Sequence, residues 1–325
     1  MQNDYLNFKP LIKSSYYQTL IGSAIDFELD LASKRHRIQL PDNDFLSVEV
    51  STPSDWVSSK WTVLMVHGLC GSHKSHYMKR IARRLYKSGV QVVRVNLRGC
   101  GSGRGLAKGI YHSGSSHDIF EVVKYVKEAF PLSPKLLIGF SLGANISLKL
   151  SGELGSDGRD YLKGVIAVSP PADLLSSARL FTLPENQFYA NYFIKLLVNE
   201  VNFRHKHFDL PPHNLPKNVT LTEFDEIYTA PIAKFSSAFE YYYYSSSKRV
   251  IPKILVPTRI LFANDDPIIK STVLDNIALP SHIKVYKTEH GGHIGFVGLN
   301  IFKEFRWMDK IVIDWVNEMT CGRSV

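Results

Sequence analysis

Residues 139–143 read Gly-Phe-Ser-Leu-Gly, and this stretch restricts the fold of the chain more than any other. An apolar run at 135–138 precedes it and predicts a buried strand, and apolar residues recur at helical spacing over 144–150. Strand, sharp turn and helix form the setting in which such a turn lifts a serine hydroxyl out of a sheet. Glycine suits both flanking positions because a Cβ there would strike the neighbouring strand and helix. A chance match in a loop is the alternative, but the flanking pattern favours Ser141 as a nucleophile.

Segments with the composition of buried strands alternate with helical segments along much of the chain. This alternation predicts an α/β fold with a mostly parallel sheet and helices on both faces. A β-hairpin is expected first, at 35–52. Strands are then expected at 62–66, 90–95, 135–138, 164–169, 258–263 and 283–286, and helices at 75–88, 118–130 and 307–319.

The alternation is interrupted between residues 170 and 253, where proline and aromatic residues increase. We interpret this segment as a mostly helical cap inserted into a core domain formed by residues 1–169 and 254–325. A cap over a serine is expected to line an acyl pocket with part of its apolar surface. The candidates recur at helical spacing: Phe181, Phe188, Tyr189, Tyr192, Phe193, Leu196 and Leu197. The four tyrosines at 241–244 fit either pocket lining or helix packing combined with an amphipathic surface.

A serine nucleophile requires a base and an acid that orients the base. Acidic residues follow the strand at 258–263, and histidines follow the strand at 283–286. The carboxyl ends of parallel strands share one edge of a sheet, so these side chains are expected near Ser141.

Two choices remain within these loops. We predict Asp266 as the acid because it lies deeper in the turn than Asp265, which is the alternative. We predict His293 as the base because two glycines precede it and let the loop approach the serine closely. His290 is nearer the strand and is interpreted as structural.

The negative charge that develops on an attacked carbonyl oxygen requires N–H donors. The backbone N–H of Leu142, directly after the serine, is one expected donor. The loop after the strand at 62–66 is expected to supply the other, which we assign to Leu69 with Cys70 as the alternative.

Charge and cysteine content restrict the partners of the chain. The formal net charge is +9, but the basic residues are scattered, so no nucleic acid partner is expected. The densest basic run, at 79–87, is interpreted as the solvated face of a helix whose apolar face contains Met78, Ile81, Ala82 and Leu85. Three cysteines do not indicate a disulfide framework.

No cofactor or metal ion is expected. The glycine-rich stretch at 99–105 does not match Gly-x-Gly-x-x-Gly, and no phosphate-binding loop motif is found. His290 and His293 have the spacing of a metal pair, but no cysteine or carboxylate cluster completes such a site.

The targeting features of the chain favour a cytoplasmic protein. Residues 1–20 lack the apolar core of a signal peptide, and no run reaches the ~18 apolar residues that a membrane-spanning helix requires. The basic surface is compatible with peripheral membrane contact. No feature indicates an oligomeric state.

Several motifs, taken together, resemble the YheT-like hydrolases, a branch of the α/β-hydrolase superfamily with lipid-hydrolase relatives in eukaryotes. They cover nearly the whole chain: residues 8–10, 16–20, 40–45, 67–69, 98–101, 111–114, 139–143, 265–267 and 290–296. The sequence departs from the family at Tyr16, where histidine is frequent, and at Asn43, where glycine is usual. The resemblance implies the α/β-hydrolase fold and hydrolysis of carboxylic esters.

We therefore expect a serine esterase that acts on short- to medium-chain acyl esters or on lipid-like substrates. A thioesterase or acyltransferase with the same serine, acid and base is the alternative enzyme. A binding protein that has kept the fold without activity is the alternative from another class.

Overall fold

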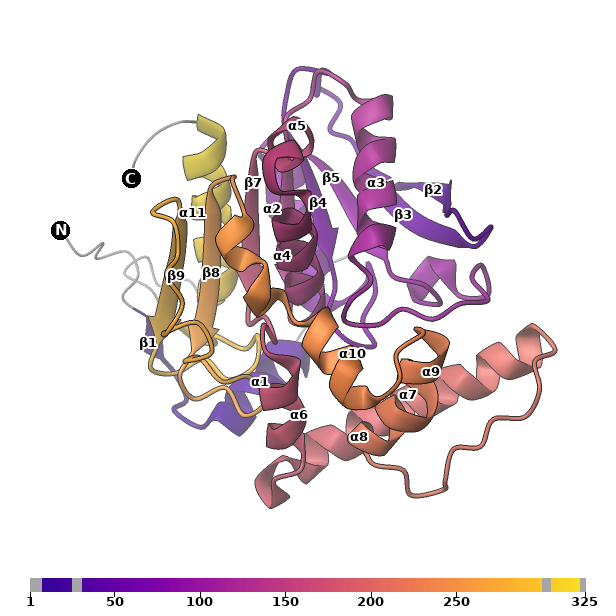
Figure 1. Cartoon of the computed structure of the whole chain (residues 1–325). Coiled ribbons are helices and arrows are strands. Elements are labelled where there is room, and N and C mark those ends of the chain that lie inside the picture. The colour runs from indigo at the N-terminus through magenta and orange to yellow at the C-terminus, as the bar shows by residue number, and fades with distance from the viewer. Residues whose placement is uncertain (1–7, 25–30, 300–304, 322–325) are drawn as a thin grey trace.

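An eight-stranded sheet runs through the centre of the computed structural model, which describes residues 8–24, 31–299 and 305–321 (Figure 1). The spatial order is β2-β3-β5-β4-β6-β7-β8-β9. The bounds are β2 Lys34–Gln39, β3 Phe45–Ser51, β4 Thr62–Val66, β5 Gln91–Asn96, β6 Lys135–Phe140, β7 Gly164–Val168, β8 Thr258–Ala263 and β9 Ile283–Thr288. The two pairs that involve β3 are antiparallel, and the strands from β5 to β9 pair in parallel. The expected α/β architecture is confirmed, with an antiparallel hairpin at one edge.

Helices cover both faces of the sheet, which explains why its central strands are mostly apolar. The helices α2 (His76–Lys87) and α11 (Trp307–Cys321) share one hydrophobic core with Val63 and Met65 of β4. The helices α3 (Ser116–Ala129) and α4 (Leu142–Leu154) share the other core with Leu64 and Val66. Successive residues of one strand therefore serve opposite cores.

The basic run on α2 differs from its expected role at one position. Its apolar face is buried as predicted, but Arg80 is also buried, and its Nε lies 2.6 Å from Asp309 Oδ2 of α11. The interpretation of the whole run as a solvated face is wrong at Arg80 because an acidic residue of a distant helix packs against it. A single sequence segment does not reveal such a partner.

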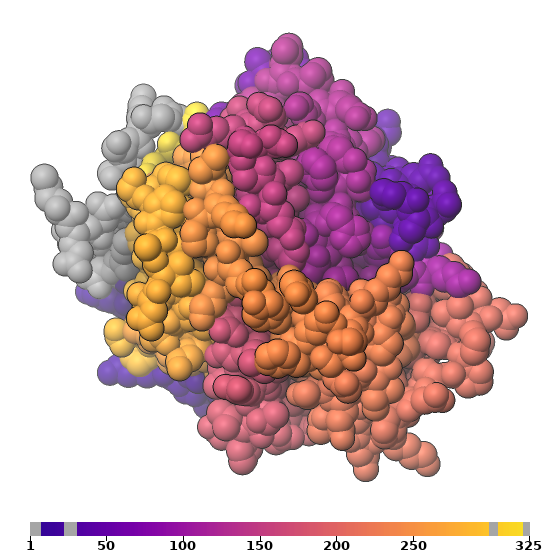
Figure 2. Space-filling view, in the orientation of Figure 1, coloured from indigo at the N-terminus to yellow at the C-terminus, as the bar shows by residue number. Residues whose placement is uncertain are grey.

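Every element that the structure describes between β7 and β8 is helical. The bounds are α6 Leu174–Phe181, α7 Gln187–His207, α8 Leu221–Phe224, a π-helical turn Asp225–Thr229, α9 Ala230–Ile232 and α10 Ala238–Ser245, and short 3-10 helices lie at Pro184–Asn186, Ser247–Arg249 and Ile251–Lys253. The helices from α6 to α10 lie together at one end of the sheet (Figures 1 and 2). Asn145 of α4 connects the helices that cover the sheet with the end of α10. Its side chain donates to the Ser245 carbonyl (2.8 Å) and accepts from the Ser247 N–H (2.9 Å). The short helix α5 (Gly158–Tyr161) precedes β7.

The N-terminal segment reaches the C-terminal part of the chain. The short strand β1 (Lys9–Pro10) pairs antiparallel with β10 (Gly298–Leu299), and the helix α1 (Ser15–Ala24) follows β1. This pairing brings α1 beside the loop that contains His293.

Candidate active site

Ser141 lies at the turn between β6 and α4, in a backbone conformation that is rare for serine. Its φ is 50° and its ψ is −121°, and its N–H donates to the Val168 carbonyl of β7 (2.8 Å). The glycine on each side is required by close packing. A Cβ at Gly139 would lie 2.4 Å from the Gly143 carbonyl oxygen, and one at Gly143 would lie 2.4 Å from the carbonyl oxygens of Val66 and His67. The turn therefore has the strain and the crowding that the Gly-x-Ser-x-Gly pattern predicts.

Ser141, His293 and Asp266 form a continuous hydrogen-bonded chain. His293 Nε2 lies 2.8 Å from Ser141 Oγ, and His293 Nδ1 lies 2.9 Å from Asp266 Oδ2. All three residues are less than 10% exposed. Because a carboxylate can only accept, Nδ1 carries the ring proton and Nε2 is left as the acceptor for the serine proton. The geometry is suited to activating Ser141 as a nucleophile.

The two neighbouring aspartates have different partners. Asp266 Oδ1 accepts from the N–H groups of Ile268 and Ile269, both at 3.0 Å, so its carboxylate is held in place while Oδ2 faces His293. Asp265 instead accepts from the Gly292 N–H (2.9 Å) and lies 3.4 Å from His290 Nδ1. Burial raises the pKa of Asp265. Asp266 thus faces the ring of His293, and Asp265 supports the loop behind it.

The loop that contains His293 is packed against α1. The His293 N–H donates to Thr19 Oγ1 (2.9 Å), and the buried side chain of Gln18 exchanges two hydrogen bonds with the Val297 backbone (2.9 and 2.6 Å). A Cβ at Gly292, where φ is +55°, would lie 2.5 Å from the Ser15 carbonyl oxygen. Only glycine allows the loop to lie this close to α1.

The loop at 67–71 lies beside Ser141, and hydroxyl groups from two other segments occupy its N–H groups. The Gly68 N–H donates to Tyr77 Oη of α2, and the Cys70 N–H donates to Tyr111 Oη, both at 2.9 Å. No hydrogen bond is recorded for the Leu69 N–H among the described residues. The Leu142 N–H, in the first turn of α4, also lacks an intrahelical acceptor. These contacts favour Leu69 over Cys70 as an oxyanion donor.

His67, at the start of this loop, is held in one tautomer by two backbone hydrogen bonds. Its Nε2 accepts from the Leu97 N–H (3.1 Å), so its Nδ1 carries the proton and donates to the Gly68 carbonyl (2.7 Å). Burial lowers the pKa of His67 to about 4, which keeps the ring neutral at neutral pH.

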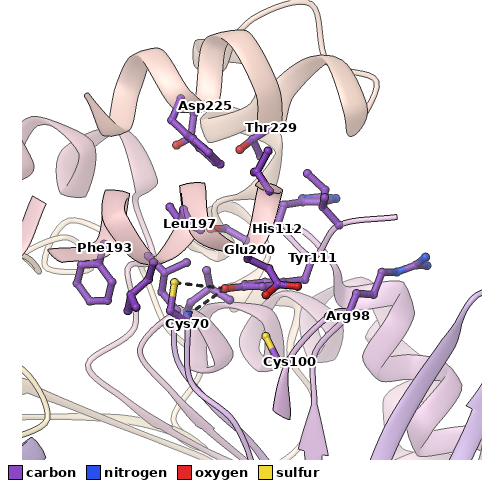
Figure 3. A pocket seen from close by; sticks show the side chains of 18 of the residues that line it. Cys70, Arg98, Cys100, Tyr111, His112, Phe193, Leu197, Glu200, Asp225 and Thr229 are labelled. Atoms are coloured by element: carbon purple, nitrogen blue, oxygen red, sulfur yellow. Dashed lines mark hydrogen bonds between the residues drawn. The ribbon is translucent and has the colours of Figure 1, made fainter. Parts of the chain in front are cut away.

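A cavity of about 390 Å³ opens beside Ser141. Its walls come from the loops at 69–71 and 98–113 and from the helices between β7 and β8 (Figure 3). Cys70 lies in this wall, but burial raises the pKa of its thiol to about 12, so it is not a competing nucleophile.

The apolar residues expected to line a pocket divide into three groups. Phe181, Phe193, Leu196 and Leu197 line the cavity, Tyr189 is buried, and Phe188 and Tyr192 are exposed. The tyrosine run divides in the same way, because the side chains of Tyr241 and Tyr242 line the cavity whereas those of Tyr243 and Tyr244 face solvent. Tyr241 and Tyr242 therefore fit the pocket-lining interpretation, and Tyr243 and Tyr244 form the exposed side of an amphipathic helix.

The comparison with protein families decides the classification. Residues 62–298 match the model of the alpha/beta hydrolase fold family. The chain belongs to this family. The expected fold class and the class of protein, an alpha/beta hydrolase, are confirmed.

Individual relatives agree with this family. YheT of Escherichia coli (strain K12), which is provisionally named an esterase, is 28% identical over 95% of this chain and 92% of its own length. A monoacylglycerol lipase of Saccharomyces cerevisiae is 28% identical over 81% of this chain and 59% of its own length. The solved structure of a Pyrococcus furiosus esterase matches with a TM-score of 0.56 and 18% identity, over 91% of this chain and 96% of that one. The expected resemblance to the YheT-like hydrolases is confirmed.

Sequence reasoning about the family's site missed four supporting residues. Thr19 and Gln18 hold the histidine loop, and Tyr77 and Tyr111 hold the loop at 67–71. Three of them fall in or beside the motifs of the resemblance, at 16–20 and 111–114, but a motif does not identify the partner of each residue.

The described part of the chain contains no group of three or more His, Cys, Asp or Glu side chains arranged to hold a metal ion. No helix within the described ranges is long and apolar enough to cross a membrane.

Proposed function

We propose that this alpha/beta hydrolase is a serine esterase that cleaves carboxylic esters through an acyl-enzyme on Ser141. The observation that carries the proposal is the 2.8 Å contact between His293 Nε2 and Ser141 Oγ, with Asp266 on the opposite ring nitrogen. The esterase and lipase names of the relatives support the ester as the substrate class.

In the first half of the reaction, Ser141 Oγ attacks the acyl carbonyl as His293 Nε2 takes the hydroxyl proton. Asp266 holds the ring in the required tautomer and stabilises the imidazolium that forms. The N–H groups of Leu69 and Leu142 donate to the oxygen of the tetrahedral intermediate. His293 then gives its proton to the leaving alcohol, and Ser141 remains acylated.

In the second half, a water molecule attacks the acyl group. His293 accepts a proton from this water and returns it to Ser141 Oγ as the carboxylic acid leaves. No step uses a cofactor.

We further propose that residues 170–253 act as a cap over Ser141. The cavity beside the serine is lined on one side by Phe181, Phe193, Leu196 and Leu197 from this segment and on the other by core loops. An apolar wall of this kind favours an acyl chain over a charged substrate. Lipid-like esters, as in the name of the yeast relative, fit this description.

A fluorophosphonate probe tests the proposal. The probe phosphonylates activated serines, so one equivalent should bind, and peptide mapping should place it on Ser141. The Ser156→Ala variant, which changes an exposed serine outside the cavity, should be labelled normally. Labelling of the Ser141→Ala variant at the wild-type rate would contradict the proposal.

A further inference from the structure

The wall of the cavity beside Ser141 is mostly apolar but contains several polar and charged side chains, among them Arg98, Glu200 and Arg204. Asp225 and Thr229 belong to the π-helical turn, and His112 belongs to a core loop. Figure 3 shows Asp225 and Thr229 on the ribbon above the cavity, across from Cys70 and Cys100. π-Helical turns are frequent at functional sites, and a carboxyl in an apolar wall needs a hydrogen-bonding partner.

Asp225 has one clear partner and spare acceptor capacity. Tyr242 Oη donates to Asp225 Oδ2 at 2.8 Å. Burial raises the pKa of Asp225 to about 6, although hydrogen bonding from the hydroxyls of Thr229 and Tyr242 opposes this shift. Above pH 7 the side chain is therefore mainly a carboxylate, which offers about four acceptor positions. At least one of these remains for a donor in the cavity.

His112 supplies a donor of fixed identity. Its Nδ1 accepts from the Gly114 N–H (3.1 Å), so the ring proton is on Nε2. Burial lowers the pKa of His112 to about 4, which keeps the ring neutral. No hydrogen-bond acceptor for this Nε2–H is found among the residues that the structure describes.

We propose that Asp225 and His112 form a polar subsite that binds a hydroxyl group of the substrate, several bonds from the scissile ester. The hydroxyl donates to the Asp225 carboxylate, and His112 Nε2–H is a further donor in the wall of the same cavity. A methyl group at this point leaves an acceptor position of the carboxylate unfilled, and the Asp225 carboxylate repels a substrate carboxylate. This inference rests on the proposed esterase function and narrows its substrate class to hydroxyl-bearing esters.

Matched substrates test the subsite on both sides of the ester. One series contains p-nitrophenyl esters of ω-hydroxy acids with about four to ten carbons, and the other contains acetates of ω-hydroxy alcohols of the same lengths. Each compound is compared with its methyl-terminated and carboxylate-terminated match. In at least one series, the hydroxyl compound should have a kcat/KM on the order of tenfold above its methyl match, and the carboxylate compound should be poorest. Equal kcat/KM values for hydroxyl and methyl compounds in both series would overturn the inference.

Variants of Asp225 show whether this residue is responsible. Asp225→Leu should abolish the hydroxyl preference, and its circular dichroism spectrum and unfolding midpoint report correct folding. Asp225→Asn, which can still pair with Tyr242, should weaken the preference and relieve rejection of the carboxylate compound. Glu185→Leu removes an exposed carboxylate of the same segment outside the cavity. This variant should change neither the preference for the hydroxyl compound nor the rejection of the carboxylate compound. A hydroxyl preference that persists in both Asp225 variants would contradict the assignment.

Binding to the Ser141→Ala variant separates this inference from the proposed function. Calorimetry with non-hydrolysable amides that end in hydroxyl or methyl measures the subsite without turnover. Tighter binding of the hydroxyl amide, lost in the Ser141→Ala/Asp225→Leu double variant, would support the subsite even if the esterase proposal failed. Equal affinity for the two amides would contradict the subsite whether or not the protein hydrolyses esters.

Discussion

Asp265 and Asp266 are adjacent in sequence, yet only Asp266 contacts the His293 ring. Asp266→Asn should lower kcat by on the order of 10⁴, because an amide that donates to Nδ1 stabilises the wrong imidazole tautomer. Asp265→Asn is the matched control and should have a much smaller effect, since its carboxylate contacts the Gly292 N–H and His290 and not the His293 ring. Steady-state kinetics with p-nitrophenyl butyrate measure both. A larger loss in Asp265→Asn would mean that the acid is misassigned by one position.

His67 should make folding stability fall below pH 7. In the unfolded chain a histidine binds a proton near pH 6.5, whereas burial lowers the pKa of His67 in the folded state to about 4. Between these two pH values the unfolded state binds one more proton at His67 than the folded state does. The contribution of neutral His67 to the free energy of unfolding is therefore present above pH 6.5 and is lost as the pH falls toward 4.

This linkage contributes about 2 kcal/mol to the loss of unfolding free energy between pH 7 and pH 5. Urea unfolding of wild type and His67→Asn at both pH values measures it. The variant is expected to be less stable at pH 7 and to lose less stability on acidification. Equal pH dependence of the two proteins would show that His67 is protonated alike in both states.

The residues of the proposed mechanism could be predicted because each is adjacent to a pattern that positions it. Ser141 follows an apolar strand and precedes a helix, and Asp266 and His293 follow later strands of the same parallel sheet. The tyrosine and Thr19 contacts could not be predicted in this way, since Thr19 lies 274 positions from His293. Arg80 was predicted to be exposed because it is charged, but it is buried. Its partner, Asp309, belongs to the distant helix α11, so the local sequence could not reveal the contact.

The loop at 67–71 is held by two other segments of the chain, α2 and the loop that contains Tyr111. The hydroxyl groups of Tyr77 and Tyr111 accept hydrogen bonds from the N–H groups of Gly68 and Cys70, and the Leu69 N–H between them is the proposed oxyanion donor. Either Tyr→Phe substitution removes one acceptor while retaining the ring, and the loop then samples other conformations.

Tyr111→Phe and Tyr77→Phe should each lower kcat by on the order of tenfold with little change in KM, because the loss falls on the transition state. Tyr243→Phe changes an exposed tyrosine outside the cavity and serves as the control. Affinity for a boronic acid transition-state analogue should weaken in parallel with kcat. A rise in KM alone would indicate that these tyrosines shape the pocket and do not position the donor.

The elements themselves followed closely from residue patterns, because both the sheet and its covering helices are built from local periodicity. The strands β4 and β8 have the expected bounds, and α2 and α3 differ from theirs by one or two residues. The role of α1 was not predictable, since it depends on the pairing of β1 with β10 across nearly the whole chain. Between β7 and β8 the sequence predicted a mostly helical segment but not the bounds of its individual helices. The packing of these helices depends on contacts with loops of the sheet domain.

Considered as a whole, the molecule encloses an apolar cavity between its sheet core and the helices that precede β8. Each CH₂ group of an acyl chain that enters it should contribute about 0.8 kcal/mol, close to fourfold in binding. The kcat/KM for p-nitrophenyl esters should therefore rise from acetate to butyrate or hexanoate and fall once the chain outgrows the cavity. A profile that is flat, or highest at acetate, would mean that the inserted segment packs without lining an acyl site.

The hydrolysis rate of the Ser141→Ala variant tests the central claim most directly. In a comparable serine hydrolase, loss of the nucleophile lowers kcat on the order of a million-fold. We predict a loss of this size on p-nitrophenyl butyrate, with an unchanged circular dichroism spectrum and unfolding midpoint. Activity within tenfold of wild type, in protein free of contaminating esterase, would contradict the assignment of Ser141 as the nucleophile.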